Sequence, residues 1–86
     1  LMEERINIGY RITDSIHIGE TEFVIGEKPS NPPMFVTWAC KNGNDFCWGH
    51  YLGSRSDAER DLVKRAAERL HFLESIRGRK GKEFER

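Results

Sequence analysis

The segment Phe35–Tyr51 constrains the fold of this chain more than any other stretch. Its sequence, FVTWACKNGNDFCWGHY, alternates in the manner of a β-hairpin around the turn signal Asn42-Gly43. Aromatic side chains are expected on both faces of this hairpin, with Trp38 on one face and Trp48 on the other. One face must contribute to a core, so the other face needs a cover or a binding partner.

Two further strands are predicted before this hairpin, the first of them interrupted by a bend or bulge. Residues 6–12 carry an apolar side chain at every second position, which is the period of a half-buried strand. The cluster Thr13-Asp14-Ser15 predicts a bend or bulge, after which residues 16–18 resume the alternation. Residues 22–26 are rich in strand formers and follow the turn signal at 19–21. Counting residues 6–18 as one strand, the sequence predicts a four-stranded antiparallel meander, with a proline-containing loop at 27–33.

A single helix is predicted after the sheet. Ser56-Asp57-Ala58-Glu59 has the form of a capping box, so the helix is expected to begin at Ser56. Gly78 is the expected end, followed by a flexible charged tail at 79–86. The resulting prediction is one α+β domain over residues 1–78, ββββα, with the helix packed on one face of the sheet. The apolar stripe expected to make that contact consists of Leu62, Val63, Ala66, Ala67, Leu70, Leu73 and Ile76.

The face of the last hairpin that contains Trp38 is assigned to the helix. Small residues in the helix stripe, Ala66 and Ala67, would let the helix lie close beneath that bulky ring. The core set is Met34, Val36, Trp38, Cys40, Cys47 and Tyr51, and the opposite face holds Phe35, Thr37, Ala39, Phe46, Trp48 and His50. The second face is either covered, by the 27–33 loop or by the amino-terminal segment, or free to bind. The candidate binding residues are Phe35, Phe46, Trp48, His50 and Lys41.

The two cysteines are expected to share one face of the hairpin. A four-residue loop at 42–45 would place Cys40 opposite Cys47, whereas a two-residue turn would pair Cys40 with Asp45. Reduced thiols that fill the core are the favoured interpretation, with a hairpin disulfide as the alternative. His17, His50 and His71 have no metal-ligand spacing with these cysteines, so neither a metal nor a cofactor is predicted.

Catalysis is not expected from this sequence. Cys47 and His50 are three residues apart, which in a regular strand directs their side chains to opposite faces. The glycines are dispersed and form no phosphate-binding loop. A chain of 86 residues allows one small domain. Because no apolar run is long enough for a membrane span or a signal peptide, a cytoplasmic protein is expected.

The distribution of charge along the chain bears on the choice between two binding functions. Residues 1–53 hold seven acidic and four basic side chains, whereas residues 54–86 hold seven acidic and ten basic ones. A protein partner, or self-association, through the aromatic face is preferred, because an acidic rim repels phosphate. The alternative is nucleic acid stacked on the same aromatic side chains. Its phosphates would be contacted by the basic residues Arg77, Arg79, Lys80 and Lys82.

The chain also resembles two families of proteins. A strand pair, an aromatic hairpin and a helix beginning within Trp48–Glu59 resemble the sheet-and-helix arm-site-binding domain of tyrosine integrases, over residues 34 to about 76. That resemblance implies a sheet placed in the DNA major groove, although Lys41 is the only cation of the hairpin. Through Phe35–Trp38 and Phe46–Tyr51 the whole chain resembles small uncharacterised accessory proteins of mobile elements from Gram-positive bacteria. This second resemblance implies a regulatory or host-interference role.

Overall fold

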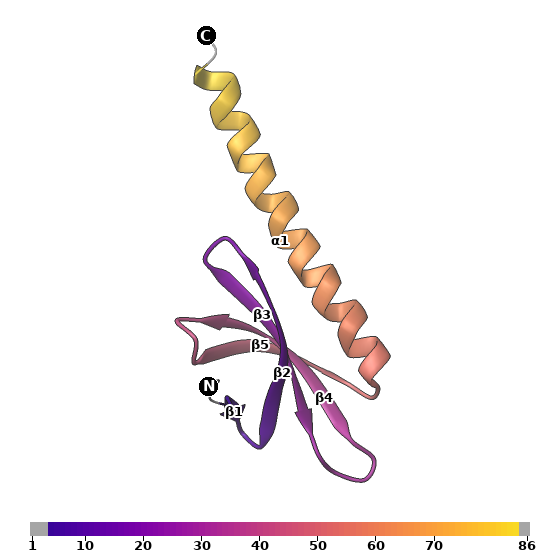
Figure 1. Cartoon of the computed structure of the whole chain (residues 1–86). Coiled ribbons are helices and arrows are strands. Elements are labelled where there is room, and N and C mark those ends of the chain that lie inside the picture. The colour runs from indigo at the N-terminus through magenta and orange to yellow at the C-terminus, as the bar shows by residue number, and fades with distance from the viewer. Residues whose placement is uncertain (1–3, 85–86) are drawn as a thin grey trace.

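The chain folds as an α+β domain with five antiparallel strands and one carboxy-terminal helix (Figure 1). The structure is a computed structural model that describes residues 4–84, with side chains described to Arg77. The strands pair in sequence order, β1-β2-β3-β4-β5, as a meander. The elements are β1 (Ile6–Asn7), β2 (Tyr10–Ile18), β3 (Thr21–Lys28), β4 (Met34–Lys41), β5 (Asp45–Leu52) and α1 (Arg55–Phe84). The α+β class and the antiparallel meander are confirmed, whereas the number of strands is five and not four.

The additional strand arises at the turn Ile8-Gly9. Both residues have a positive φ, 43° and 86°, which is the signature of a two-residue hairpin turn and divides the predicted first strand into β1 and β2. The predicted irregularity at 13–15 is confirmed, because the register of β2 against β3 shifts between Ile12 and Asp14. The last hairpin closes with Lys41 opposite Asp45, so its loop has three residues and neither predicted length.

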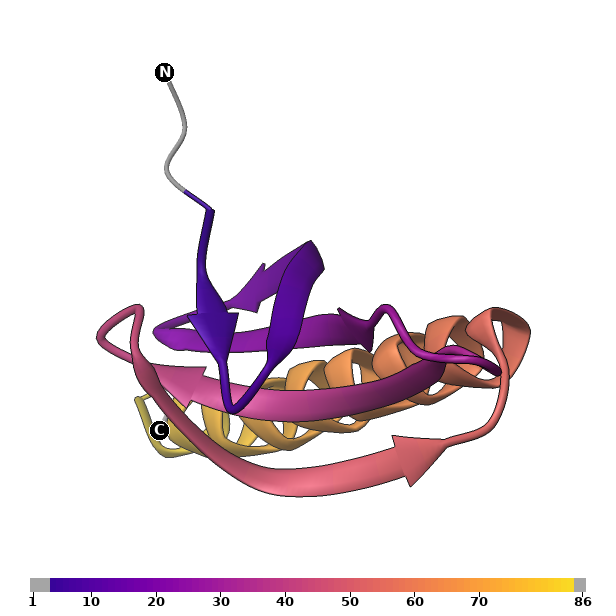
Figure 2. The ribbon, with the colours of Figure 1, turned by 90° about the horizontal axis from the view of Figure 1, so that it is seen from below.

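The sheet is covered on both faces. Figure 2 shows α1 behind the sheet and the β1–β2 hairpin folded over the opposite face. The core under α1 contains Phe23, Ile25, Phe35, Ala39, Ala58, Leu62 and Ala66. The core under the β1–β2 hairpin contains Tyr10, Val24, Val36, Trp38 and Cys40. The amino-terminal segment therefore covers the face opposite α1, but this is the Trp38 face and not the Phe35 face for which a cover was considered.

The predicted assignment of the two hairpin faces is wrong, because the helix packs against Phe35 and not against Trp38. Phe35 is 7% exposed and lies in the core under α1. Its neighbours on that face of β4, Thr37 and Ala39, are small and let the helix approach closely. Trp38 is 3% exposed on the other face, where its ring makes an edge contact with Tyr10 at 5.7 Å between centroids. The curl of the sheet provides the space that this indole needs.

The helix also begins and ends differently from the prediction. Ser54 is the N-cap, since its Oγ accepts a hydrogen bond from the Asp57 amide at 3.1 Å and its carbonyl accepts one from Ala58. The predicted cap, Ser56, lies within the first turn. Gly78 does not end the helix, which continues to Phe84, so residues 79–84 are helical; residues 85–86 lie outside the described part.

Only part of the predicted apolar stripe is buried. Leu62 and Ala66 of this stripe are buried against the sheet, as is Ala58 outside it, whereas Val63 and Leu70 are exposed. The carboxy-terminal part of α1 extends beyond the tip of the β2–β3 hairpin (Figure 1). Within residues 4–84, α1 lacks the apolar length that a bilayer-spanning helix requires.

Candidate binding site between β5 and α1

A β-bulge in β5 determines where Trp48 lies. Thr37 pairs with His50 and Ala39 pairs with Cys47, so Trp48 and Gly49 together stand opposite Trp38. The indole of Trp38 occupies the space next to Gly49, where a Cβ atom would lie 2.8 Å from Trp38 Nε1. Only glycine fits this close approach. Trp48 takes the left-handed conformation at the bulge, with φ 54°.

Trp48 is unusual in both its exposure and its backbone conformation. Its side chain is 71% exposed, more than any other large apolar side chain described, and Ile8 follows with 67%. These two residues also have a positive φ. Asn42, the other non-glycine residue described with a positive φ, occupies an ordinary Asn-Gly turn. For a bulky residue this conformation costs about 1–3 kcal/mol, and leaving an aromatic side chain in water forgoes roughly 1.5–3 kcal/mol more.

Trp48 borders a hollow between β5 and α1, referred to below as the Trp48 hollow. Phe72 of α1 also lines this hollow and is 49% exposed. It lies three helical turns after Asp61. The floor includes the buried Phe23, whose ring lies 5.7 Å from the guanidinium carbon of Arg65. The hollow is lined by Phe23, Trp48, His50, Arg65, Glu68, Arg69 and Phe72.

A polar network fixes one wall of the Trp48 hollow. Asp61 of α1 accepts hydrogen bonds from the hydroxyl of Thr37, which is fully buried in β4, and from His50 of β5, whose Nδ1 lies 2.8 Å from Asp61 Oδ2. Because a carboxylate only accepts, Nδ1 of His50 carries a proton. Partial burial opposes the ionisation of Asp61, but these hydrogen bonds lower the pKa of its carboxyl. The network joins β4, β5 and α1 and holds the His50 ring beside Trp48.

Arg65 belongs to the same network, whereas Arg69 does not. Arg65 donates from Nη1 to the carbonyl and the hydroxyl of Thr37, at 3.1 and 3.2 Å, and burial lowers the pKa of its guanidinium. Arg69 lies one helical turn further on, with its guanidinium carbon 5.2 Å from the Phe72 ring. Its Nε is buried without a hydrogen-bond partner. The Trp48 hollow therefore combines aromatic surface with a cation that has no hydrogen-bond acceptor among the described residues.

The predicted binding residues do not form one surface. Trp48 and His50 come together at the Trp48 hollow, but Phe35 is buried under α1 and is not available to a partner. Phe46 is half-buried on the opposite face, against Trp38. Lys41 is exposed at the hairpin loop and lines a neighbouring hollow that also contains Arg69. The aromatic face expected from strict alternation is thus reduced to Trp48.

Sequence reasoning missed the helical half of the site. Arg65, Arg69 and Phe72 recur at helical spacing on the flank of α1 that faces β5. A signal was present, because Phe72 stands outside the apolar stripe predicted for the core. Of the alternative phosphate-binding residues, Arg77 lines a separate hollow with His17 and Leu70. The other three, Arg79, Lys80 and Lys82, lie in the last turns of the helix, where side chains are not described.

The three-residue loop overturns the expectation that Cys40 and Cys47 share a face, because it pairs Cys40 with Phe46 and Ala39 with Cys47. Cys40 is buried in the core under the β1–β2 hairpin, and Cys47 packs against the core under α1; both thiols are free. The argument that parity separates Cys47 from His50 fails because the bulge lies between these two residues, so both side chains lie on the helix side. The Cys47 thiol contacts the Ala39 carbonyl at 3.5 Å, while His50 contacts Asp61.

A second polar cluster lies on the opposite face of the sheet. The carboxylate of Glu22, buried in β3, receives two hydrogen bonds from Arg5 at 2.6 and 3.0 Å and another from Ser15. These contacts, led by the one from Arg5, lower the pKa of Glu22 to about 2. Arg5 also donates to the Gly43 carbonyl, so this cluster ties the amino-terminal segment to the last hairpin. Its groups satisfy one another, which indicates a structural role.

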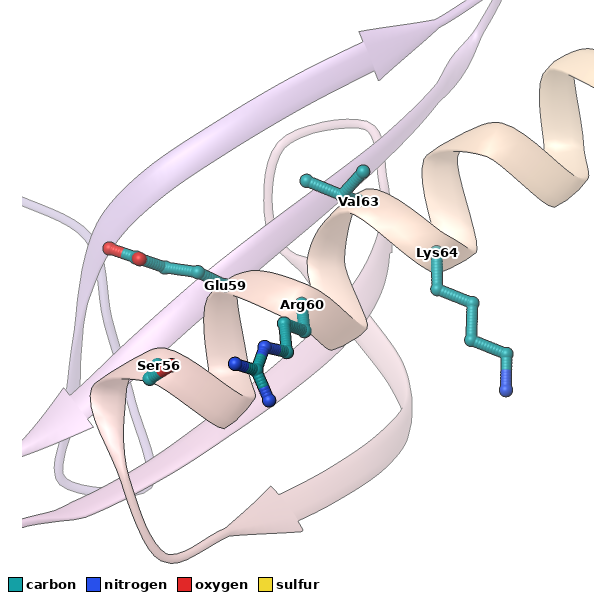
Figure 3. A pocket seen from close by; sticks show the side chains of 5 residues that line it. All are labelled: Ser56, Glu59, Arg60, Val63 and Lys64. Atoms are coloured by element: carbon teal, nitrogen blue, oxygen red, sulfur yellow. The ribbon is translucent and has the colours of Figure 1, made fainter.

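The outer surface of the first helical turns forms a further shallow depression (Figure 3). Glu59, Arg60 and Lys64 point in different directions around the exposed Val63, so no polar groups converge there. Among the residues described, no three His, Cys, Asp or Glu side chains are arranged to hold a metal ion. Comparison of the chain with protein-family models, curated proteins and solved structures gives no significant match.

Proposed function

We propose that this chain is a non-catalytic module that binds a protein partner through the Trp48 hollow. The observation that carries the proposal is the position of Trp48, which is exposed and held in a left-handed conformation at a bulge. Tryptophan and arginine are the residue types most enriched at the energetic centres of protein interfaces. Trp48, Phe72 and the two arginines of the hollow provide that composition on a scaffold fixed by the Asp61 network.

The partner is proposed to belong to the host of a mobile element. This part of the proposal rests on the resemblance of the Phe35–Trp38 and Phe46–Tyr51 segments to accessory proteins of such elements. A module of this size can act by occupying a surface of a larger machine, which needs one well-anchored aromatic contact and no catalytic group. A cytoplasmic location is part of the same proposal.

Nucleic acid is the second candidate, because arginine side chains lie beside aromatic rings at the Trp48 hollow. Arg69 is 5.2 Å from the Phe72 ring, and an exposed tryptophan next to such a pair can stack on a base. The protein partner is favoured because acidic side chains interrupt the cationic surface. Glu68 lines the Trp48 hollow, and Glu20 lines the neighbouring one that contains Lys41 and Arg69.

The test compares Trp48→Ala with Tyr51→Ala in affinity capture from a lysate of the source organism, with and without nuclease. Tyr51 is the matched control, because it is an exposed aromatic residue of the same strand that contacts Tyr10 on the opposite face. A nuclease-resistant partner should be lost with Trp48→Ala and retained with Tyr51→Ala. Equal capture by both variants would exclude the Trp48 hollow as the binding site.

A direct titration separates the two candidates. For a protein partner, binding should change little with moderate salt and survive deletion of residues 79–86. Binding to single- or double-stranded oligonucleotides should fall steeply with salt, because counterions are released, and should weaken on that deletion. Salt-sensitive oligonucleotide binding tighter than roughly micromolar, beyond the non-specific range, would decide for nucleic acid.

A further inference from the structure

We infer that the partner segment presents a carboxylate next to an apolar side chain, and that Arg69 binds this carboxylate while Trp48 and Phe72 hold the apolar group. The inference rests on the proposed function and names the chemistry that the Trp48 hollow selects. It begins from the polar contacts of Arg69, which differ from those of the other partly buried arginines described.

Four arginines of the described chain are partly buried, and three of them have polar partners. Arg5 pairs with Glu22, Arg55 pairs with Asp14 and Glu59, and Arg65 donates to Thr37. Arg69 makes none of the hydrogen bonds or ion pairs found among these residues, and its Nε is buried without an acceptor. The guanidinium of Arg69 is therefore not paired with an acceptor among these residues, and an arginine fork presents paired donors that match a carboxylate.

The position of Arg69 connects aromatic surface to cationic surface. It lines the Trp48 hollow on one side and, on the other, the hollow near the last hairpin that includes Lys41. A segment lying across both would meet Trp48 and Phe72 first and the guanidinium of Arg69 next. This order requires an apolar group and an acidic group close together in the partner.

Charge favours a single carboxylate over a run of phosphates. The two hollows contain three permanent cations, Lys41, Arg65 and Arg69, together with the carboxylates of Glu20 and Glu68. Arg65 is already engaged by Thr37. The surplus positive charge is therefore small, whereas nucleic-acid affinity is built from several phosphate contacts. One acidic side chain, or a free carboxyl terminus, is the anion that this surface can neutralise.

The test selects random displayed peptides on the full chain and measures the selected peptides as synthetic ligands. Selected sequences should contain Asp, Glu or a terminal carboxylate within a few residues of an aromatic or aliphatic side chain. Replacing that carboxylate with an amide should weaken binding to the unmodified chain about tenfold or more. The same replacement should have little effect on binding to Arg69→Gln, because the group that recognises the carboxylate is then absent.

Controls keep this result separate from folding and from general charge. Arg60→Gln removes an exposed arginine on the outer surface of α1 and should behave like the unmodified chain. Arg69→Lys keeps the charge but loses the fork, so its affinity should fall between the two. All variants should unfold at similar temperatures, because Arg69 makes no described polar contact whose loss would destabilise the fold.

The outcomes distinguish this inference from the proposed function. Peptides that need Trp48 but are equally tight with Arg69→Gln would overturn the carboxylate assignment and leave the binding site in place. A selection without Trp48-dependent peptides would overturn both. Tight binding of a short single-stranded oligonucleotide that is lost in Arg69→Gln would assign the arginine to phosphate and also overturn the inference.

Discussion

Trp48 departs from two preferences of a bulky aromatic residue, because its backbone is left-handed and its side chain is exposed. Its backbone is left-handed at the bulge, next to the close approach of Trp38 to Gly49, and its side chain is exposed to water. Neither property helps the domain fold, since smaller residues tolerate the bulge position better. A residue that is unfavourable for stability on two counts is expected at a functional position.

Substitution of Trp48 by glycine and by alanine separates the backbone effect from the side-chain effect. Trp48→Gly removes the strain at φ 54°, whereas Trp48→Ala keeps a Cβ in the left-handed region. The glycine variant should therefore be more stable than the alanine variant by about 1 kcal/mol in urea unfolding. Equal stabilities, or a less stable glycine variant, would show that the bulge stores no strain. Both variants should lose partner binding.

The start of the helix illustrates an ambiguity at the residue scale. Ser54 is followed three residues later by Asp57, and Ser56 is followed three residues later by Glu59, so two overlapping cap signals compete. The sequence predicts the helix but cannot rank these signals, because both serines are sterically suitable. The structure uses Ser54, which also places Arg55 within reach of Asp14 and Glu59.

Ser54→Ala should cost about 0.5–2 kcal/mol of unfolding free energy, since it removes the acceptor of the Asp57 amide. Ser56→Ala is the matched control and should be nearly neutral, because alanine is a good helix former at an exposed position. Urea denaturation followed by circular dichroism measures both. A larger loss of unfolding free energy in Ser56→Ala than in Ser54→Ala would show that Ser56 is the N-cap, as expected from the capping box.

At the scale of elements, β5 explains which parts of the site could be predicted. The strand and its antiparallel pairing with β4 follow from alternation and from Asn42-Gly43, and both are confirmed, whereas the loop has three residues in place of the two or four expected. The bulge at Trp48 has no signal of its own in one sequence, yet it reverses the parity of every later residue in the strand. His50 therefore faces α1 with Cys47, whereas the three-residue loop places Phe46 on the opposite face, so the predicted aromatic face is not formed. Periodicity also could not choose the helix face, because both faces of β4 are apolar.

Fluorescence of single-tryptophan variants should reveal the two environments of this hairpin. Trp38, measured in Trp48→Phe, should emit at short wavelength and resist quenching by iodide, because the ring is enclosed by Tyr10 and Phe46. Trp48, measured in Trp38→Phe, should emit at longer wavelength and be quenched. If both are shielded in a dilute monomer, the Trp48 hollow is covered within the chain and cannot be the proposed site.

The contact between the amino-terminal segment and β3 should make stability depend on pH. Glu22 has a pKa of about 2 in the folded protein against an ordinary 4.5, so the unfolded chain binds its proton first as the pH falls. Stability from this group is complete above pH 4.5 and is lost between about 4.5 and 2, by up to about 3 kcal/mol. Glu22→Gln should flatten the unfolding free energy over this window. An unchanged slope in the variant would assign the pH dependence to other carboxyls, such as Asp14 and Asp61.

At the scale of the whole molecule, the fold class follows from the order of elements, but the distribution of the core does not. Alternating strands followed by one capped helix predict an α+β domain, as found. The prediction assumed one core under the helix, whereas the curl of the sheet creates a second core under the β1–β2 hairpin. The helix length was underestimated because Gly78 costs only about 1 kcal/mol within a helix, and the charged residues around it are good helix formers.

The presence of a core on each face of β4 has a consequence for biosynthesis. The β1–β2 hairpin, which covers the Trp38 side of this strand, is synthesised before it, and α1, which covers the Phe35 side, is synthesised after it. Until Leu62 and Ala66 have been released, Phe35 and Ala39 lack the helix that covers them. The nascent chain therefore carries an incompletely packed sheet with one exposed apolar face. In this state, binding by chaperones competes with aggregation. Completion of folding is tied to translation of the helix, and a ribosome stalled before it would present a substrate for quality control.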